Sequence, residues 1–244
     1  MLGLQQQEQG AINTIEQLRA QAGFYRLCGR LLEGEIDHDL LLLLRGELRE
    51  PLAEIGVVAS DGFFNDPEPA VLEAMAEEFT GLLVAPGAMM PYASVFETGR
   101  MFQQPADRAA AAYQQAGWRF QHRMSGEFPD HIGVMLSFYA LLLDAQAGAL
   151  ERDDRASADL SCEQAERCLV ELLAPWAPGW CRLAAKAALN PFYRQLLAAL
   201  EQSLWLEISD RALSRETLKE LAALNNREPP RLDYDADFRK ASGL

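Results

Sequence analysis

Apolar residues recur along most of the chain at intervals of three and four, the spacing of one face of an α-helix. The densest case is residues 132–147. Two apolar stripes cover this segment: Ile132, Met135, Leu136, Tyr139, Leu142 and Leu143, and beside them Val134, Phe138 and Leu141. A helix that is apolar around most of its circumference belongs inside a helical domain. We therefore expect this helix to be the buried centre of the fold.

The same period predicts further helices, and capping or breaking residues mark their ends. Asp37 is suited to cap the second helix, and Pro86-Gly87 ends the third. Residues 51–58 add at most a turn or two, 60–69 form a loop, and 175–180 form a compact turn that holds two tryptophans. The expected helices span residues 12–32, 38–48, 70–84, 107–116, 156–173, 181–189, 192–208 and 215–224.

No segment has the alternating pattern of a strand, and no repeat of 20–50 residues occurs. Short loops between amphipathic helices predict an all-α, bundle-like fold. We expect one helical domain over residues 1–224. A hinge at 119–128 divides it into an N-terminal part (1–118) and a C-terminal part (129–224), and residues 225–244 form a flexible tail.

Polar side chains gather where the central helix begins. Pro129 suits a first helical turn, and Glu127 and Asp130 place negative charge near its free N–H groups, followed by His131. Three interpretations stay open: a helix cap, a polar recognition site, or a catalytic or metal site. The chain has neither HExxH nor paired Glu-x-x-His, so metal binding is the least favoured.

Residues 89–102 are expected to be irregular and carry many apolar side chains. Exposed apolar residues in a loop often line a binding site, but they can equally cover the core. The pattern alone does not decide between these two roles.

The charge of the chain restricts its partners. The formal net charge is −14 at pH 7, and 49% of the residues are hydrophobic. Nucleic acid is not an expected partner, because neutralising phosphates requires basic patches. An acidic surface instead favours a basic peptide or protein.

The cysteines and the N-terminal sequence indicate a reducing cellular compartment. The four cysteines form no CxxC pair, and the N-terminus lacks the basic and apolar regions of a signal peptide. No window approaches ~18 uninterrupted apolar residues. We therefore expect a cytoplasmic protein without a membrane span.

Nucleotide and hydrolase motifs are absent. The sequence has no GxxxxGK[ST] phosphate loop, no GxGxxG after a strand and no GxSxG elbow. Only three lysines occur, and none lies beside a glycine-rich turn. We predict no cofactor.

Three segments together carry a resemblance to a known family. They are Phe24-Tyr25-Arg26-Leu27, then the stretch 78–87 (EFTGLLVAPG) continuing through 91–96 (PYASVF), and Glu127-x-Pro129-Asp130-His131-Ile132. The chain resembles the TorD/DmsD/NarJ family of dedicated chaperones for molybdenum enzymes over roughly residues 12–207. One departure is Phe128, because some members place proline directly after the glutamate.

The resemblance implies a TorD-like helical bundle that is not an enzyme. Such a protein binds the basic and apolar twin-arginine leader of a DMSO-reductase-class molybdoenzyme catalytic subunit precursor, and holds it back from export until cofactor is inserted. It is a monomer that can form domain-swapped dimers through the hinge. The resemblance implies peptide binding by Tyr25, Phe79, Leu82, Leu83, Tyr92, Phe96, Glu127, Pro129, Asp130 and His131.

Two other functions stay open on the residues alone. One is a small helical metal-dependent hydrolase that uses Glu127, Asp130 and His131. The other is an oligomerising scaffold without a ligand. Charge reversal at Asp130 is expected to weaken peptide binding while the fold survives.

Overall fold

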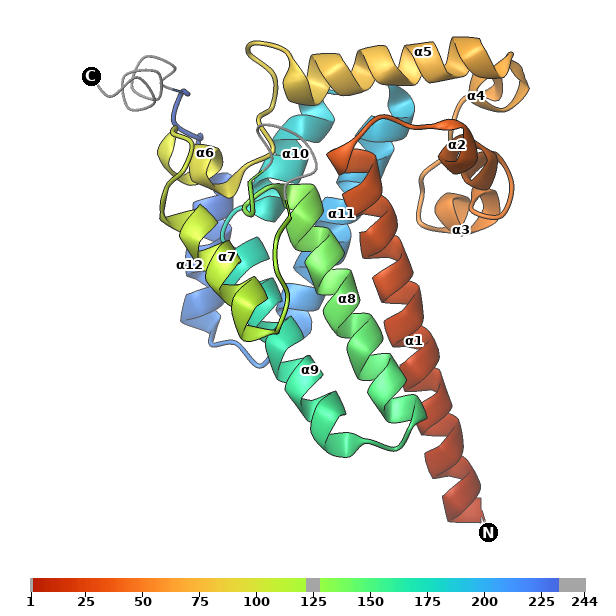
Figure 1. Ribbon diagram of the computed structural model, residues 1–244, viewed down its shortest axis with the longest axis vertical. Coiled ribbons are helices and arrows are strands. Elements are labelled where there is room, and N and C mark those ends of the chain that lie inside the picture. Colours follow the sequence, from red (N-terminus) through yellow and green to blue (C-terminus); the bar gives the residue numbers. More distant parts are fainter. Residues whose placement is uncertain (1, 122–127, 233–244) are drawn as a thin grey trace.

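The central helix lies between two long neighbours, as Figure 1 shows for the computed structural model, which describes residues 2–121 and 128–232. Helix α8 (Ile132–Glu151) runs antiparallel to α1 (Leu2–Glu33), and α9 (Arg155–Arg167) packs along its other side. The described residues form α-helices, two π-helical turns and one isolated bridge, with no strand among them. The all-α prediction is confirmed.

Helices α1 and α8 approach closely because glycines face each other where they cross. A Cβ atom on Gly29 would lie 2.9 Å from the carbonyl oxygen of Gly133, and one on Gly133 would lie 2.8 Å from that of Gly29. The Ser137 hydroxyl donates to Glu33 Oε1 at 2.8 Å beside this crossing. Small residues therefore allow the two backbones to pack directly, and polar contacts secure the pair.

The other helices surround this pair. In the N-terminal half, α5 lies across one end of α1 and α8, with α2–α4 beside it (Figure 1). The remaining elements are α2 (His38–Arg45), α3 (Arg49–Glu54), α4 (Asp61–Asn65), α5 (Glu68–Phe79), η1 (Thr80–Val84), α6 (Ala93–Thr98), α7 (Gln104–Gln115), η2 (Cys168–Leu173), α10 (Ala177–Ala187), α11 (Pro191–Asp210) and α12 (Arg215–Asn226).

Short helices stand where the sequence pattern predicted loops. Helix α4 lies within the predicted 60–69 loop, because the Ser60 hydroxyl accepts from the backbone N–H of Phe63. Helix α6 lies within the stretch predicted to be irregular, and α10 begins at Ala177, inside the predicted turn. Each is held by tertiary contacts that a short apolar run does not reveal.

The predicted tail begins too early at Asn225. This residue is 0% exposed, its side-chain oxygen accepts from Gly179 N at 2.7 Å, and its amide donates to the carbonyls of Ala174 and Leu221. Residues 227–232 then continue along α6, close to Gly99. Residues 233–244 lie outside the described part.

Most of the predicted hinge also lies outside the described residues. Of 119–128, the structure describes 119–121 and 128. The division at this hinge and the domain-swapped dimer therefore stay predictions, which light scattering tests.

One described helix, α8, is long and apolar enough to cross a membrane. Its neighbours α1 and α9 bury most of its side chains, including Ile132, Leu136 and Tyr139 at 0% exposure. Its composition is that of a core helix of a helical domain.

Gly29→Ala should lower the free energy of unfolding by about 1–3 kcal/mol, because the added methyl meets the Gly133 carbonyl and the Ser137 hydroxyl. Gly23→Ala is the matched control on the same helix, where a Cβ meets nothing within 4 Å. It should be neutral or stabilising by up to about 1 kcal/mol. Urea unfolding measures both. Equal effects of the two variants would contradict the close crossing.

Candidate functional site

Two of the recognised sequence segments meet at the start of α8. Tyr92 and His131 form an isolated antiparallel bridge, although they are far apart in sequence. The Ile132 N–H donates to the Pro91 carbonyl at 2.8 Å, and the Ala93 N–H donates to the Asp130 carbonyl at 3.1 Å. The main chain therefore joins the beginning of α6 to the beginning of α8.

Asp130 reinforces this junction with its side chain. Its carboxylate Oδ2 accepts from the Ser94 N–H at 2.8 Å, and the residue is 1% exposed. With its own carbonyl on Ala93, Asp130 satisfies two first-turn N–H groups of α6, which has no side-chain cap of its own. The carboxylate thus acts as the N-terminal cap of α6, provided from another part of the chain. Charge reversal here would bury an unpaired arginine, so the expectation of an intact fold is not supported.

His131 caps α8. Its Nδ1 accepts from the Gly133 N–H at 3.1 Å, and its ring lies edge-on to Tyr92 with 5.1 Å between centroids. Burial lowers the pKa of His131 to about 4, so the imidazole is neutral at pH 7. The cap occupies Nδ1, one of the two ring nitrogens through which an imidazole can bind a metal. The described residues hold no group of three or more His, Cys, Asp or Glu side chains that could bind a metal.

Aromatic side chains cover the outside of the junction. Phe128 packs edge-on against Tyr92 and Phe102, with centroid distances of 5.9 and 4.2 Å. The Tyr113 hydroxyl donates to the Pro129 carbonyl at 2.6 Å, which ties α7 to the same turn. Tyr92 and Pro129 are half-buried. They are therefore the predicted site residues in this cluster that a partner can reach.

The other predicted site residues lie elsewhere. Phe79, Leu82, Leu83 and Phe96 are core residues, each at most 9% exposed, and of these only Leu82 lines a cavity, one of about 360 Å³ beside Gly81 and Met89. Tyr25 is fully buried, and its hydroxyl donates to Glu207, which also accepts from Tyr139. Glu127 lies outside the described residues.

An open groove runs beside the junction, between α1, α7, α8 and the segment after α7. Its cavity of about 330 Å³ is lined by Glu33, Tyr113, Trp118, Arg119, Phe120, Gln121, Val134, Ser137, Phe138 and Leu141. Trp118 is 45% and Leu141 36% exposed, while Glu33 places a half-buried carboxylate at the wall. A second hollow shares Trp118 and reaches Pro129. No motif marks these residues, so sequence reasoning missed this groove.

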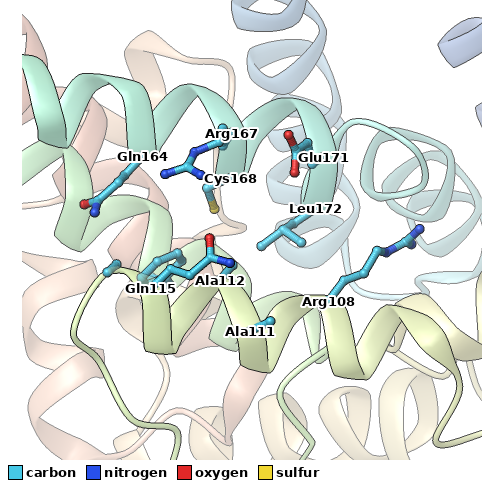
Figure 2. A pocket seen from close by; sticks show the side chains of 11 residues that line it. Arg108, Ala111, Ala112, Gln115, Gln164, Arg167, Cys168, Glu171 and Leu172 are labelled. Atoms are coloured by element: carbon cyan, nitrogen blue, oxygen red, sulfur yellow. The ribbon is translucent and has the colours of Figure 1, made fainter.

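A smaller cavity of about 230 Å³ lies between α7 and the α9–η2 pair. Figure 2 shows Gln164, Arg167 and Glu171 along one wall and Gln115 and Arg108 along the other. The Arg108 guanidinium donates to both carboxylate oxygens of Glu97, at 2.8 and 3.1 Å. Burial raises the pKa of the Cys168 thiol well above its usual range, so this thiol is not a nucleophile. The cavity lies where the alanine-rich side of α7 faces η2.

A comparison with models of protein families assigns the chain to one family. The model described as nitrate reductase delta subunit matches residues 43–182, which is more than half of the chain and includes both segments of the junction. No curated protein matches the chain.

Asp130→Ala should lower the free energy of unfolding by about 1–3 kcal/mol, because it leaves the buried Ser94 N–H without an acceptor. Asp107→Ala, which removes an exposed first-turn carboxylate of α7, is the control and should cost less than about 1 kcal/mol. Chemical denaturation compares them. A smaller loss for Asp130→Ala than for its control would contradict the capping role.

His131 should make the protein less stable in acid. The unfolded pKa of about 6.5 lies above the folded value of about 4, so between these pH values the unfolded chain binds the extra proton. Its contribution is complete above pH 6.5 and falls by up to about 3 kcal/mol toward pH 4.

His131→Asn keeps a capping acceptor without the titration and should flatten this acid limb of a pH–stability curve. His38→Asn is the control. The exposed His38 has its pKa raised by a hydrogen bond to Glu68, the opposite direction. An unchanged acid limb in His131→Asn would refute the assignment.

Proposed function

The chain belongs to the nitrate reductase delta subunit family, and from this premise we propose that it binds the N-terminal twin-arginine leader of its client. Binding holds the catalytic subunit precursor of a DMSO-reductase-class enzyme back from export until its cofactor is inserted.

Members of this family, the TorD/DmsD/NarJ group, are non-catalytic chaperones, and this chain is one of them. They work in the cytoplasm on nitrate reductase-type molybdoenzymes, and their partner is the catalytic subunit. Membership removes the hydrolase alternative, and the capping roles of Asp130 and His131 agree with this.

The observation that carries the leader proposal is the groove beside the junction. It combines exposed apolar side chains, Trp118 and Leu141, with the carboxylate of Glu33. A leader of this class has the complementary order, arginines followed by an apolar segment. An arginine can donate to Glu33 in a charge-assisted hydrogen bond, while the apolar residues pack on Trp118, Val134 and Leu141.

The magnitudes suit a transient chaperone complex. Burial of each large apolar side chain contributes about 1.5–3 kcal/mol, offset by the cost of ordering the peptide. A micromolar dissociation constant corresponds to about −8 kcal/mol, which a few such contacts supply. The negative net charge of the chain accelerates encounter with a basic leader.

The predicted site residues take two roles in this proposal. Tyr92 and Pro129, which are half-buried, contact the leader directly. Glu127, two positions before Pro129 in the chain, lies outside the described residues and stays a predicted contact. Asp130 and His131 do not contact the leader; they hold the junction in place by capping α6 and α8. Tyr25, Phe79, Leu82, Leu83 and Phe96 support the helices from the core.

Calorimetric titration with a synthetic twin-arginine leader should show roughly micromolar binding, and changing both arginines to alanine should weaken it about tenfold or more. Glu33→Gln should weaken binding of the intact leader about five- to tenfold, since the amide still accepts from Ser137 but lacks the charge.

Glu16→Gln, an exposed change on the same helix, is the matched control and should leave the affinity within twofold. Equal affinities for the leader with and without its arginines would contradict arginine recognition. A leader that binds equally well to the Glu33→Gln variant would move the site away from this groove.

A further inference from the structure

The C-terminal segment after α12 covers one edge of α6, and the family model match ends before it, at residue 182. Just before the segment, Asn225 in the last turn of α12 is fully buried and held by three hydrogen bonds. Arg182 adds two more contacts, to the carbonyl of Asn225 at 2.6 Å and the side chain of Asn226 at 2.9 Å. The start of the segment is therefore firmly anchored.

Beyond this anchor the segment is held weakly, and an arginine makes the main contacts. The Arg227 guanidinium lies over the Phe96 ring, 5.8 Å from its centroid, and its Nη2 donates to the Glu97 carbonyl at 3.3 Å. Its Nε is buried without a hydrogen-bond partner. The contacts are long and incompletely satisfied, so another arginine-bearing segment can replace them.

The α6 edge is shaped for an extended backbone. Gly99 has a φ of +70°, and a Cβ atom there would lie 2.6 Å from the Arg231 carbonyl oxygen and 2.9 Å from Pro230. Two consecutive prolines, Pro229 and Pro230, keep the covering segment extended. Glycine thus allows the segment to lie directly on the end of α6.

The Glu97 carboxylate and main-chain carbonyl make the edge favourable for the guanidinium of an arginine. Burial raises the pKa of the half-buried Glu97 carboxyl, and Arg108 and then Arg227 act against that rise. The Glu97 carboxylate is already paired with Arg108, which leaves its main-chain carbonyl and the face of Phe96 for the second guanidinium. Residues 227–232 (REPPRL) place Arg227 at this edge and continue through Glu228 and two prolines to Arg231 and Leu232, so they share with a basic leader an arginine on an extended backbone.

We infer that the α6 edge of Phe96, Glu97 and Gly99 binds arginine-bearing extended segments, that residues 227–232 are its resident occupant, and that the client leader displaces them. This inference rests on the proposed function. The short tether from Asn225 gives the resident segment a high effective concentration, so it lowers the apparent affinity for the leader. The leader competes because it also fills the groove beside Trp118.

Two variants test the α6 edge and its resident segment separately. Gly99→Ala leaves the tail sequence unchanged and obstructs the edge for the resident segment and the leader alike, because its Cβ meets any backbone that lies there. Its control is Gly56→Ala, which has the same positive φ (+81°) but meets nothing within 4 Å. Arg227→Ala removes the guanidinium, and Arg215→Ala is its control, because Arg215 is exposed on α12.

The measurement is calorimetric titration of all five full-length proteins with the twin-arginine leader, after thermal unfolding has verified each fold. Arg227→Ala should bind the leader about three- to tenfold more tightly than the wild type. Gly99→Ala should show no such gain, because its Cβ obstructs the leader at the same edge, and both controls should stay within twofold of the wild type. Addition of leader should also accelerate tryptic cleavage after Arg227 in the wild type, and the leader without its arginines should not.

The outcomes separate the two proposals. Leader binding by the wild type, with unchanged or weaker affinity in Arg227→Ala, overturns the inference and leaves the proposed function standing. Absence of leader binding in all five proteins overturns the proposed function and the inference with it. Faster cleavage with both leaders alike would also overturn arginine-for-arginine displacement.

Discussion

The main-chain pairing of residues 91–93 with 130–132 is the constraint on which the rest of the structure depends. Helix α8 is buried along most of its length, so the polar groups at its beginning must be satisfied by protein. The Pro91 carbonyl accepts from Ile132, His131 caps the helix with its own ring, and Asp130 gives its carbonyl and carboxylate to α6. Two helices from different parts of the chain thus begin at one junction.

This junction explains why the most recognisable residues are largely inaccessible. Asp130 is 1% and His131 9% exposed, and the side chain of each accepts a hydrogen bond from a backbone N–H group. Their residue types are those of a binding site, but their work is to hold α6, α7 and α8 in a fixed relation. In our proposal, recognition falls to two surfaces that this arrangement creates, the groove at Trp118 and Leu141 and the edge of α6.

The groove and the α6 edge have the same combination of chemical groups. Each offers an aromatic or apolar face next to a carboxylate or carbonyl oxygen, which suits a guanidinium attached to an apolar segment. Glu33 is held by Ser137 at the groove, and Glu97 is held by Arg108 at the edge. In both places a neighbouring side chain holds the acid in position before any partner binds. A chain with a net charge of −14 adds long-range attraction for any basic segment.

The sequence by itself determined the helical class and the central helix, because the apolar period is a local property of the chain. It also identified the Asp37 cap of α2, whereas α8 begins at Ile132 and has no acidic residue in its first turn. Tertiary structure alone decided that Asp130 would face α6 and that Phe79, Leu82 and Leu83 would be core. It also decided that Asn225 would be buried and that Glu33 would meet Trp118 across a groove. These outcomes depend on contacts between residues far apart in the chain, which no local pattern encodes.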